Sequence, residues 1–170
     1  MVLWLIGLSG VGKTTLAKEI VSLVRRDVSN VALIDGDVMR ELFCNDLGYS
    51  LEDRKKNADR ICRLCKFMDD QKIHVVCAIL SLFPESREWN RKNIRNYFEV
   101  FIDAPFEHLV ERDYKGLYRK ALNKEIKDVA GMDIEFTQPA GSDLIIQNDE
   151  GKQKLLSFAP LLANKIIGEN

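Results

Sequence analysis

The sequence lacks several features that would assign it to a specialised class of protein. Its 25 Lys and Arg residues are balanced by 26 Asp and Glu residues, so the net charge is −1 and no basic excess favours nucleic acid. No stretch reaches the roughly 20 apolar residues that a membrane-spanning helix needs. No basic segment with a cleavable apolar stretch precedes the first apolar run. We therefore expect no nucleic-acid partner and no membrane contact.

Residues that bind metals or form disulfides are scarce, with four Cys and two His in the chain. Cys62 and Cys65 form a C-x-x-C pair, but it lies in a helical pattern where residues three apart share one face, and no second pair completes a zinc site. We expect these to be buried structural thiols, and we expect His74 and His108 to serve in packing or at the surface. The length suits one α/β domain spanning residues 1–170.

One motif near the N-terminus dominates what the sequence does contain. The stretch Gly7-Leu8-Ser9-Gly10-Val11-Gly12-Lys13-Thr14 matches G-x-x-x-x-G-K-[ST], between an apolar strand-like run and a helical pattern. Such a loop wraps a phosphate chain with backbone N–H groups, its Lys reaches the β- and γ-phosphates, and its Thr binds Mg²⁺. We therefore predict a cytoplasmic protein that binds a nucleoside triphosphate through Gly7, Ser9, Gly10, Val11, Gly12, Lys13, Thr14 and Thr15.

Apolar runs alternate with helical patterns along the rest of the chain, which indicates a three-layer α/β fold with about five parallel strands and helices on both faces. A polar, Lys-rich segment without a strand signal, residues 113–139, is expected to form a helical lid over the reacting groups. The further strands are predicted at 31–34, 75–80, 99–103 and 143–147, and the further helices at 38–44, 51–70, 84–96, from Pro105 onward and at 151–167.

Two carboxylates, Asp35 and Asp37, follow the second predicted strand, and ligands bind at such strand ends in this architecture. One can hold Mg²⁺ through water while the other accepts the proton of an attacking hydroxyl. We favour Asp37 as the base and Asp35 as the metal-side residue, although the reverse assignment is open. Either residue can alternatively cap the following helix.

Charged side chains near the same cleft can complete a phosphoryl-transfer site. Arg40 and Arg54 can clamp an anionic acceptor by bidentate bonds, with Asn57 beside them, or can simply form a solvated helix face. Arg112 and Lys115 open the lid and suit either stabilisation of the transferring phosphoryl group or stacking on the base of the nucleotide. Lys127 is a weaker candidate of the same kind.

Several motifs together resemble the adenylylsulfate kinases, which transfer phosphate from ATP to the ribose 3′-hydroxyl of adenylyl sulfate. The resemblance covers almost the whole chain and implies a P-loop kinase fold, ATP as co-substrate, Mg²⁺ and often a homodimer. By resemblance, Asp37 is the catalytic carboxylate, Arg112 an ATP-side arginine and Lys115 a phosphate-binding lysine. Arg40, Arg54 and Asn57 are acceptor contacts, and Tyr49 replaces a Phe that stacks on the acceptor base. The motifs are the phosphate loop, Asp35-Gly36-Asp37-Val38-Met39-Arg40, Asp46-Leu47-Gly48-Tyr49-Ser50, Asp53-Arg54 with Asn57, and Lys115-Gly116-Leu117-Tyr118.

The departures from that family fall on the acceptor side. Leu80-Ser81-Leu82-Phe83-Pro84 replaces Ile-Ser-Pro-Tyr-Arg, so an arginine is missing, and whether Arg87 replaces it or Ser81 contacts the acceptor is open. Val129 stands where the family has a second stacking Phe, which removes about 1–3 kcal/mol of base stacking. A wrong acceptor is rejected through fit and hydrogen bonding rather than through the phosphoryl chemistry.

We therefore hypothesise a kinase with a changed nucleotide acceptor. The pattern is similar to a divergent branch, found with capsule-modification enzymes, that phosphorylates cytidine diphosphoramidate on its 3′-hydroxyl. An ordinary adenylylsulfate kinase with a tolerant pocket is the main alternative, and a regulatory P-loop NTPase is a distant one. A small-metabolite kinase is not expected to carry Asp46-Leu47-Gly48-Tyr49-Ser50 or Lys115-Gly116-Leu117-Tyr118.

Overall fold

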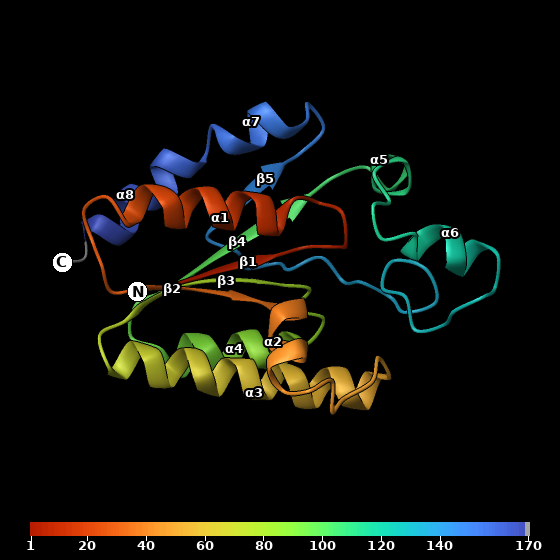
Figure 1. Cartoon of the computed structure of the whole chain (residues 1–170), viewed down its shortest axis with the longest axis horizontal. Coiled ribbons are helices and arrows are strands. Elements are labelled where there is room, and N and C mark those ends of the chain that lie inside the picture. Colours follow the sequence, from red (N-terminus) through yellow and green to blue (C-terminus); the bar gives the residue numbers. More distant parts are fainter. Residues whose placement is uncertain (169–170) are drawn as a thin grey trace.

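The computed structural model describes residues 1–168, which form a five-stranded, fully parallel sheet in the order β2-β3-β1-β4-β5 (Figure 1). Each predicted strand is present, with ends shifted by two residues at most, because strands buried on both faces read as continuous apolar runs. The strands are β1 (Val2–Ile6), β2 (Val31–Asp35), β3 (His74–Ile79), β4 (Tyr97–Asp103) and β5 (Leu144–Gln147).

Helices cover both faces of the sheet, as predicted, and give three layers. Leu3 and Leu5 of β1 point to one face, where α1 (Lys13–Val24) and α8 (Ala159–Ile167) pack. Trp4 and Ile6 point to the other face, which α3 (Leu51–Asp70) and α4 (Pro84–Asn93) cover (Figure 1). This alternation divides the apolar interior into one cluster on each side of the sheet.

Three of the four cysteines lie in the cluster beneath α3 and α4. Cys62, Cys65 and Cys77 are buried, as predicted for the first two, and burial raises the pKa of the Cys62 thiol to about 12. A thiol with such a pKa stays protonated at neutral pH and is a poor nucleophile or metal ligand. Within residues 1–168, no group of three or more His, Cys, Asp or Glu residues is arranged to hold a metal ion.

Local hydrogen bonds explain where several helices begin. The side chain of Ser50 accepts a bond from Asp53 N at 3.2 Å and caps α3 at its predicted start. The helix α2 (Gly36–Leu42) begins two residues earlier than expected because the Asp35 carboxylate accepts from Asp37 N at 2.9 Å. The start of α2, directly after β2, is thus fixed by a capping carboxylate.

Other predicted helices are shorter or divided. The last predicted helix is two helices, α7 (Lys152–Leu156) and α8, because Pro160 in the first turn of α8 has no N–H to continue a helix from Leu156. The helix α4 ends at Asn93 rather than Asn96. Pro105 is the N-cap of α5 (Phe106–Glu111) rather than its first residue.

The lid, residues 113–139, is helical only in its first part. It contains α6 (Leu117–Leu122), while the remainder consists of turns and an isolated bridge between Ala130 and Ile134. Lys124 and Asp128 have positive φ angles, 59° and 64°, which interrupt a helix. The lid lies beyond the carboxyl ends of the strands (Figure 1). Within the part of the chain described, no helix has the length and apolar character required to cross a membrane.

Candidate active site

A cavity of about 720 Å³ lies at the carboxyl ends of the strands, between the phosphate loop and the lid. Its volume is within the range of small-ligand sites. The structure brings most of the predicted site residues together around it. They are Ser9, Gly10, Gly12, Lys13, Thr14, Thr15, Asp35, Asp37, Tyr49, Arg54, Arg112, Lys115, Lys127 and Val129.

The phosphate loop requires glycine where other elements approach it closely. Gly7 has a φ of 147°, and a Cβ atom there would lie 2.3 Å from the carbonyl oxygen of Ile102. Gly12 has a φ of 102°, and a Cβ atom there would lie 2.4 Å from Leu155. A side chain of the lid also holds the loop, because Tyr118 donates to Ser9 O at 2.9 Å. The loop is therefore shaped before any ligand binds.

The loop lysine interacts with the main chain of its own loop. Lys13 Nζ donates to the carbonyls of Gly7 and Leu8, each at 2.8 Å. Burial lowers the pKa of Lys13 to about 8, and the negative charge of Asp35 opposes that shift. An anion in the cavity therefore stabilises the charged form of this side chain.

The two strand-end carboxylates have different environments. Asp35 is buried and accepts from Thr14 Oγ1 at 2.5 Å and from Asp37 N at 2.9 Å. The Asp37 side chain is 59% exposed and pairs with Lys115 of the lid. The sequence left open whether one acid caps the helix, and the structure shows that Asp35 does. Asp37 is the carboxylate with room for a substrate hydroxyl.

Tyr49 forms one wall of the cavity and is held by two arginines. Its ring lies 4.6 Å from the Arg40 guanidinium and 5.4 Å from that of Arg54. Arg54 also donates to Tyr49 O at 2.8 Å and to Asp128 O at 2.7 Å. Arg54 thus joins the loop that carries Tyr49 directly to the lid.

Five predicted residues are not among those that line the cavity. Gly7 and Val11 belong to the phosphate loop but face away from the cavity, and Val11 is fully buried. The Arg40 side chain donates to Leu47 O at 3.0 Å and Gly48 O at 2.8 Å, so it supports the Tyr49 loop. Asn57 is buried in α3, and the Ser81 hydroxyl accepts from the indole of Trp4 at 3.2 Å.

The structure also places two further residues that the sequence assigned to, or left open for, the acceptor side. Val129 borders the cavity, but only 2% of it is exposed and it packs in the cluster beneath α1. Arg87 does not reach the cavity, because it donates to Ser81 O at 2.8 Å and lies 4.0 Å from Glu99. No arginine from the exit of β3 replaces the one that the resembled family has there.

Sequence reasoning missed several residues that line the cavity, among them Tyr114, Lys120, Asn148, Lys152 and Leu155. Asn148 directly follows β5, so the rule that ligands bind at strand ends would have identified it. Tyr114 is 92% exposed and adjoins Lys115, a position that the lid motif does not specify. Lys152 and Leu155 belong to a helix whose place above the phosphate loop has no local sequence signal.

Comparison with known proteins agrees with this geometry. Residues 1–147 match the family described as adenylylsulphate kinase. The chain is 40% identical over 150 residues to the cytidine diphosphoramidate kinase of Campylobacter jejuni, covering 86% of this chain and 85% of that one. It is 37% identical over 168 residues to the adenylyl-sulfate kinase of Pseudomonas aeruginosa, covering 98% and 82%.

The fold is also similar to a solved structure, that of the Mycobacterium tuberculosis APS kinase in complex with AMPPNP and APS. The TM-score is 0.85 at 31% identity, and the match covers 99% of this chain and 97% of the other. These relatives are kinases that phosphorylate a hydroxyl group. With its phosphate loop, paired strand-end carboxylates and lid, the chain belongs to the adenylylsulphate kinase family of ATP-using phosphotransferases.

Proposed function

We propose that this kinase transfers the γ-phosphoryl group of ATP to the ribose 3′-hydroxyl of a nucleotide acceptor, and that cytidine diphosphoramidate is the preferred acceptor. The observation that carries the proposal is the place of Asp37. Its exposed carboxylate lies in the same cavity as Lys13 and Tyr49, and it contacts Lys115. A base, phosphate-binding groups and an aromatic platform thus share one site.

The donor half of the cavity suits a magnesium nucleotide. Thr14 Oγ1 and Asp35 Oδ2 lie 2.5 Å apart and provide the oxygen ligands that Mg²⁺ prefers. Thr14 would hold the ion directly and Asp35 through water, and when bound the ion neutralises charge on the β- and γ-phosphates. Lys13 exchanges the carbonyls of Gly7 and Leu8 for phosphate oxygens.

The acceptor half supplies the base for the transfer. The 3′-hydroxyl oxygen attacks the γ-phosphorus, its proton passes to the Asp37 carboxylate, and the bond from the γ-phosphorus to the β-bridging oxygen breaks to release ADP. Lys115, which neutralises Asp37 before substrates bind, is placed to stabilise charge on the transferring group. Asp37 is favoured over Asp35 as the base because the Asp37 side chain is exposed, whereas Asp35 is buried and bonded to Thr14 and to the start of α2.

The acceptor preference is supported by the walls of the cavity. Tyr49 offers an aromatic face, and Val129, which also borders the cavity, has no ring where the resembled family has a second stacking Phe. The loss of that stacking partner is compatible with a one-ring pyrimidine as the acceptor base. The similarity to the C. jejuni enzyme points the same way. Arg54 can bind the anionic diphosphoramidate, and this reaction would serve modification of a capsule. A cytoplasmic location, where ATP is available, is part of the proposal, and a homodimer stays a prediction.

A second function has specific support and must be tested in the same experiment. The P. aeruginosa adenylyl-sulfate kinase aligns with 98% of this chain, so adenylyl sulfate is the competing acceptor. Initial rates are measured with Mg·ATP and each acceptor by coupled ADP release, and ³¹P NMR identifies the 3′-phosphorylated product. We expect kcat/KM for cytidine diphosphoramidate to exceed that for adenylyl sulfate at least tenfold. The reverse order overturns the acceptor assignment, and ADP release independent of either acceptor overturns the transfer to a nucleotide.

A further inference from the structure

The turn between β3 and α4, residues 80–83, contains a buried serine in an unusual backbone conformation. Ser81 has a φ of 55° and is only 6% exposed. A residue with a side chain adopts this left-handed conformation at a cost in free energy, and it persists only when its surroundings impose it. Such strain is concentrated at functional sites, so the turn is a candidate for a functional role.

The turn forms part of the cavity wall beside the catalytic carboxylates. Leu80, immediately before Ser81, lines the cavity together with Ala78 and Ile79 of β3. Ala78 is the register partner of Asp35 in the neighbouring strand. A shift of residues 80–83 would therefore move the wall that an acceptor contacts next to Asp35 and Asp37.

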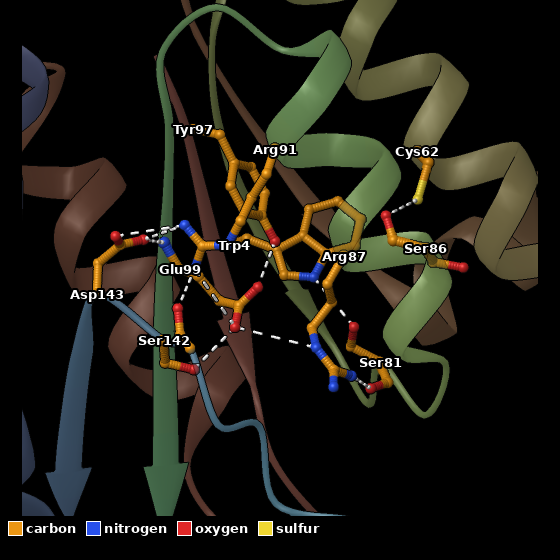
Figure 2. Close-up of polar contacts among 11 residues, drawn as sticks. Trp4, Cys62, Ser81, Ser86, Arg87, Arg91, Tyr97, Glu99, Ser142 and Asp143 are labelled. Carbon is orange, nitrogen blue, oxygen red and sulfur yellow. Dashed lines mark hydrogen bonds and ion pairs between the residues drawn. The ribbon is translucent and has the colours of Figure 1, made fainter.

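Two buried side chains donate hydrogen bonds to Ser81 (Figure 2). Trp4 Nε1 donates to Ser81 Oγ at 3.2 Å, and Arg87 donates to Ser81 O at 2.8 Å. Trp4 is fully buried, and neither Trp4 nor Arg87 lines the cavity. Both bonds hold the turn against the sheet and α4, and the Ser81 hydroxyl faces the indole.

The arginine is itself fixed by a buried carboxylate. Arg87 Nε lies 4.0 Å from Glu99 Oε1, and Glu99 is 2% exposed. Tyr97 and Ser142 each donate to Glu99 at 2.8 Å, on different oxygens (Figure 2). Arg91 also lies 3.7 Å from Glu99 Oε1, so two arginines face this buried carboxylate and its charge attracts Arg87 to the position where it bonds to Ser81.

We propose that Ser81 is a positioning residue of the acceptor site, which acts by keeping the 80–83 turn in place through Trp4 and Arg87 and does not touch the substrate. The role rests on the proposed function, because it concerns the acceptor of that reaction. It also gives the strained turn a purpose, which is to hold Leu80 in place as an apolar part of the cavity wall.

The test uses Ser81→Ala, Trp4→Phe and the double variant. Trp4→Phe removes the indole N–H but leaves the Ser81 hydroxyl in place, so only an indirect role makes the two single variants alike. We expect each single variant to raise the acceptor KM about fivefold, the effect of one lost hydrogen bond, with kcat and the ATP KM changed less than about twofold. The acceptor KM of the double variant should be no higher than that of either single variant, because all three variants remove the same contact.

Tyr97→Phe is the matched control. It removes a hydroxyl that bonds to Glu99 Oε2 and not to Ser81, while Glu99 Oε1, the oxygen that faces Arg87, keeps Ser142 and Arg91 as partners. We expect an unchanged acceptor KM. Thermal unfolding verifies that each protein is folded, and if Trp4→Phe is not, Arg87→Lys replaces it, since a lysine keeps the charge near Glu99 but cannot reproduce the bond from Nη1 to Ser81 O.

A second readout does not depend on activity. Amide hydrogen exchange across residues 80–83 of the ligand-free protein should accelerate in Ser81→Ala and Trp4→Phe and not in Tyr97→Phe. The acceptor KM and kcat of each variant are measured with the acceptor that the wild type phosphorylates, either cytidine diphosphoramidate or adenylyl sulfate. If it phosphorylates neither, the proposed function fails, and unchanged exchange would then refute the positioning role separately.

Other kinetic outcomes overturn the inference. A loss of kcat of about 100-fold or more in Ser81→Ala alone, a size typical of a group engaged in the chemistry, shows that Ser81 contacts the reacting groups. Additive effects in the double variant show that Trp4 and Ser81 act independently. Unchanged acceptor KM in both single variants shows that the turn does not position the acceptor.

Discussion

Replacing Asp37 by Asn separates the proposed catalytic role of this carboxylate from its structural one. The ion pair of Asp37 with Lys115 is solvent-exposed, with 59% and 62% of the two side chains accessible. Exposed pairs contribute about 0–1 kcal/mol to the free energy of unfolding. For a domain of this size, about 1 kcal/mol corresponds to a shift of about 2–4 °C in Tm. We therefore expect Asp37→Asn to lower Tm by no more than about 4 °C.

The effect on catalysis should be far larger. Asn matches Asp in size but cannot accept the proton of the acceptor hydroxyl, and general-base catalysis contributes about 10²- to 10⁴-fold in rate. Asp37 makes no side-chain bond to the phosphate loop, whereas Asp35 accepts from Thr14. Asp37→Asn should thus lower kcat by about 10²- to 10⁴-fold with unchanged AMPPNP affinity. Asp35→Asn should instead weaken binding of the magnesium nucleotide.

The assay combines kcat at saturating ATP and acceptor, AMPPNP affinity by calorimetry, and thermal unfolding. Asp70→Asn is the matched control, because Asp70 is 54% exposed, pairs with Lys66, and ends α3. It should leave kcat and nucleotide affinity unchanged. A rate for Asp37→Asn within about tenfold of the wild type would remove Asp37 from the base role, since general-base contributions are larger than that. A loss of AMPPNP affinity as large as the loss of kcat would place Asp37 on the donor side instead.

Two further predictions concern the opposite halves of the cavity. Because the nucleotide binds the charged form of Lys13, whose pKa is about 8 in the free protein, the Kd for AMPPNP measured by calorimetry should rise about tenfold per pH unit above pH 8. Lys13→Arg, which stays charged, should remove that rise, and a flat wild-type profile contradicts the assigned pKa. Tyr49→Leu should raise the acceptor KM about 5- to 150-fold, the value of one stacked base, without changing the ATP KM. An equal rise in both KM values would contradict the acceptor-side position of Tyr49.

The sheet and the phosphate loop could be predicted because their signals are local. Strands buried on both faces are continuous apolar runs, and the loop carries its glycines, Lys13 and Thr14 within one motif. The lid could not be predicted in the same way. Its path after α6 depends on the positive φ of Asp128 and on the bond from Arg54 to Asp128 O, a contact between residues 74 apart in sequence.

Side-chain direction was the harder part of the site. Ser81 lies at a strand exit, where the sequence suggests contact with a ligand, but its left-handed backbone turns the hydroxyl to Trp4, 77 residues away in sequence. Val129 occupies, by resemblance of the lid motif, the place of a stacking residue, yet its side chain packs into the core. Long-range packing decided both outcomes, and no local pattern encodes it.

The contacts of the lid explain how an acceptor can change while the transfer reaction is kept. Arg54 holds the lid through the main-chain carbonyl of Asp128, which any residue that adopts the positive φ at that position supplies. Tyr118 likewise holds the phosphate loop through the carbonyl of Ser9. Substitutions in the lid after α6 therefore leave these two attachments intact, whereas the contact of Lys115 with Asp37 requires both side chains. The geometry of transfer depends on the pair of Lys115 with Asp37, whereas the walls of the acceptor site depend on side chains that can be replaced. Acceptor specificity can therefore diverge without loss of the phosphoryl chemistry.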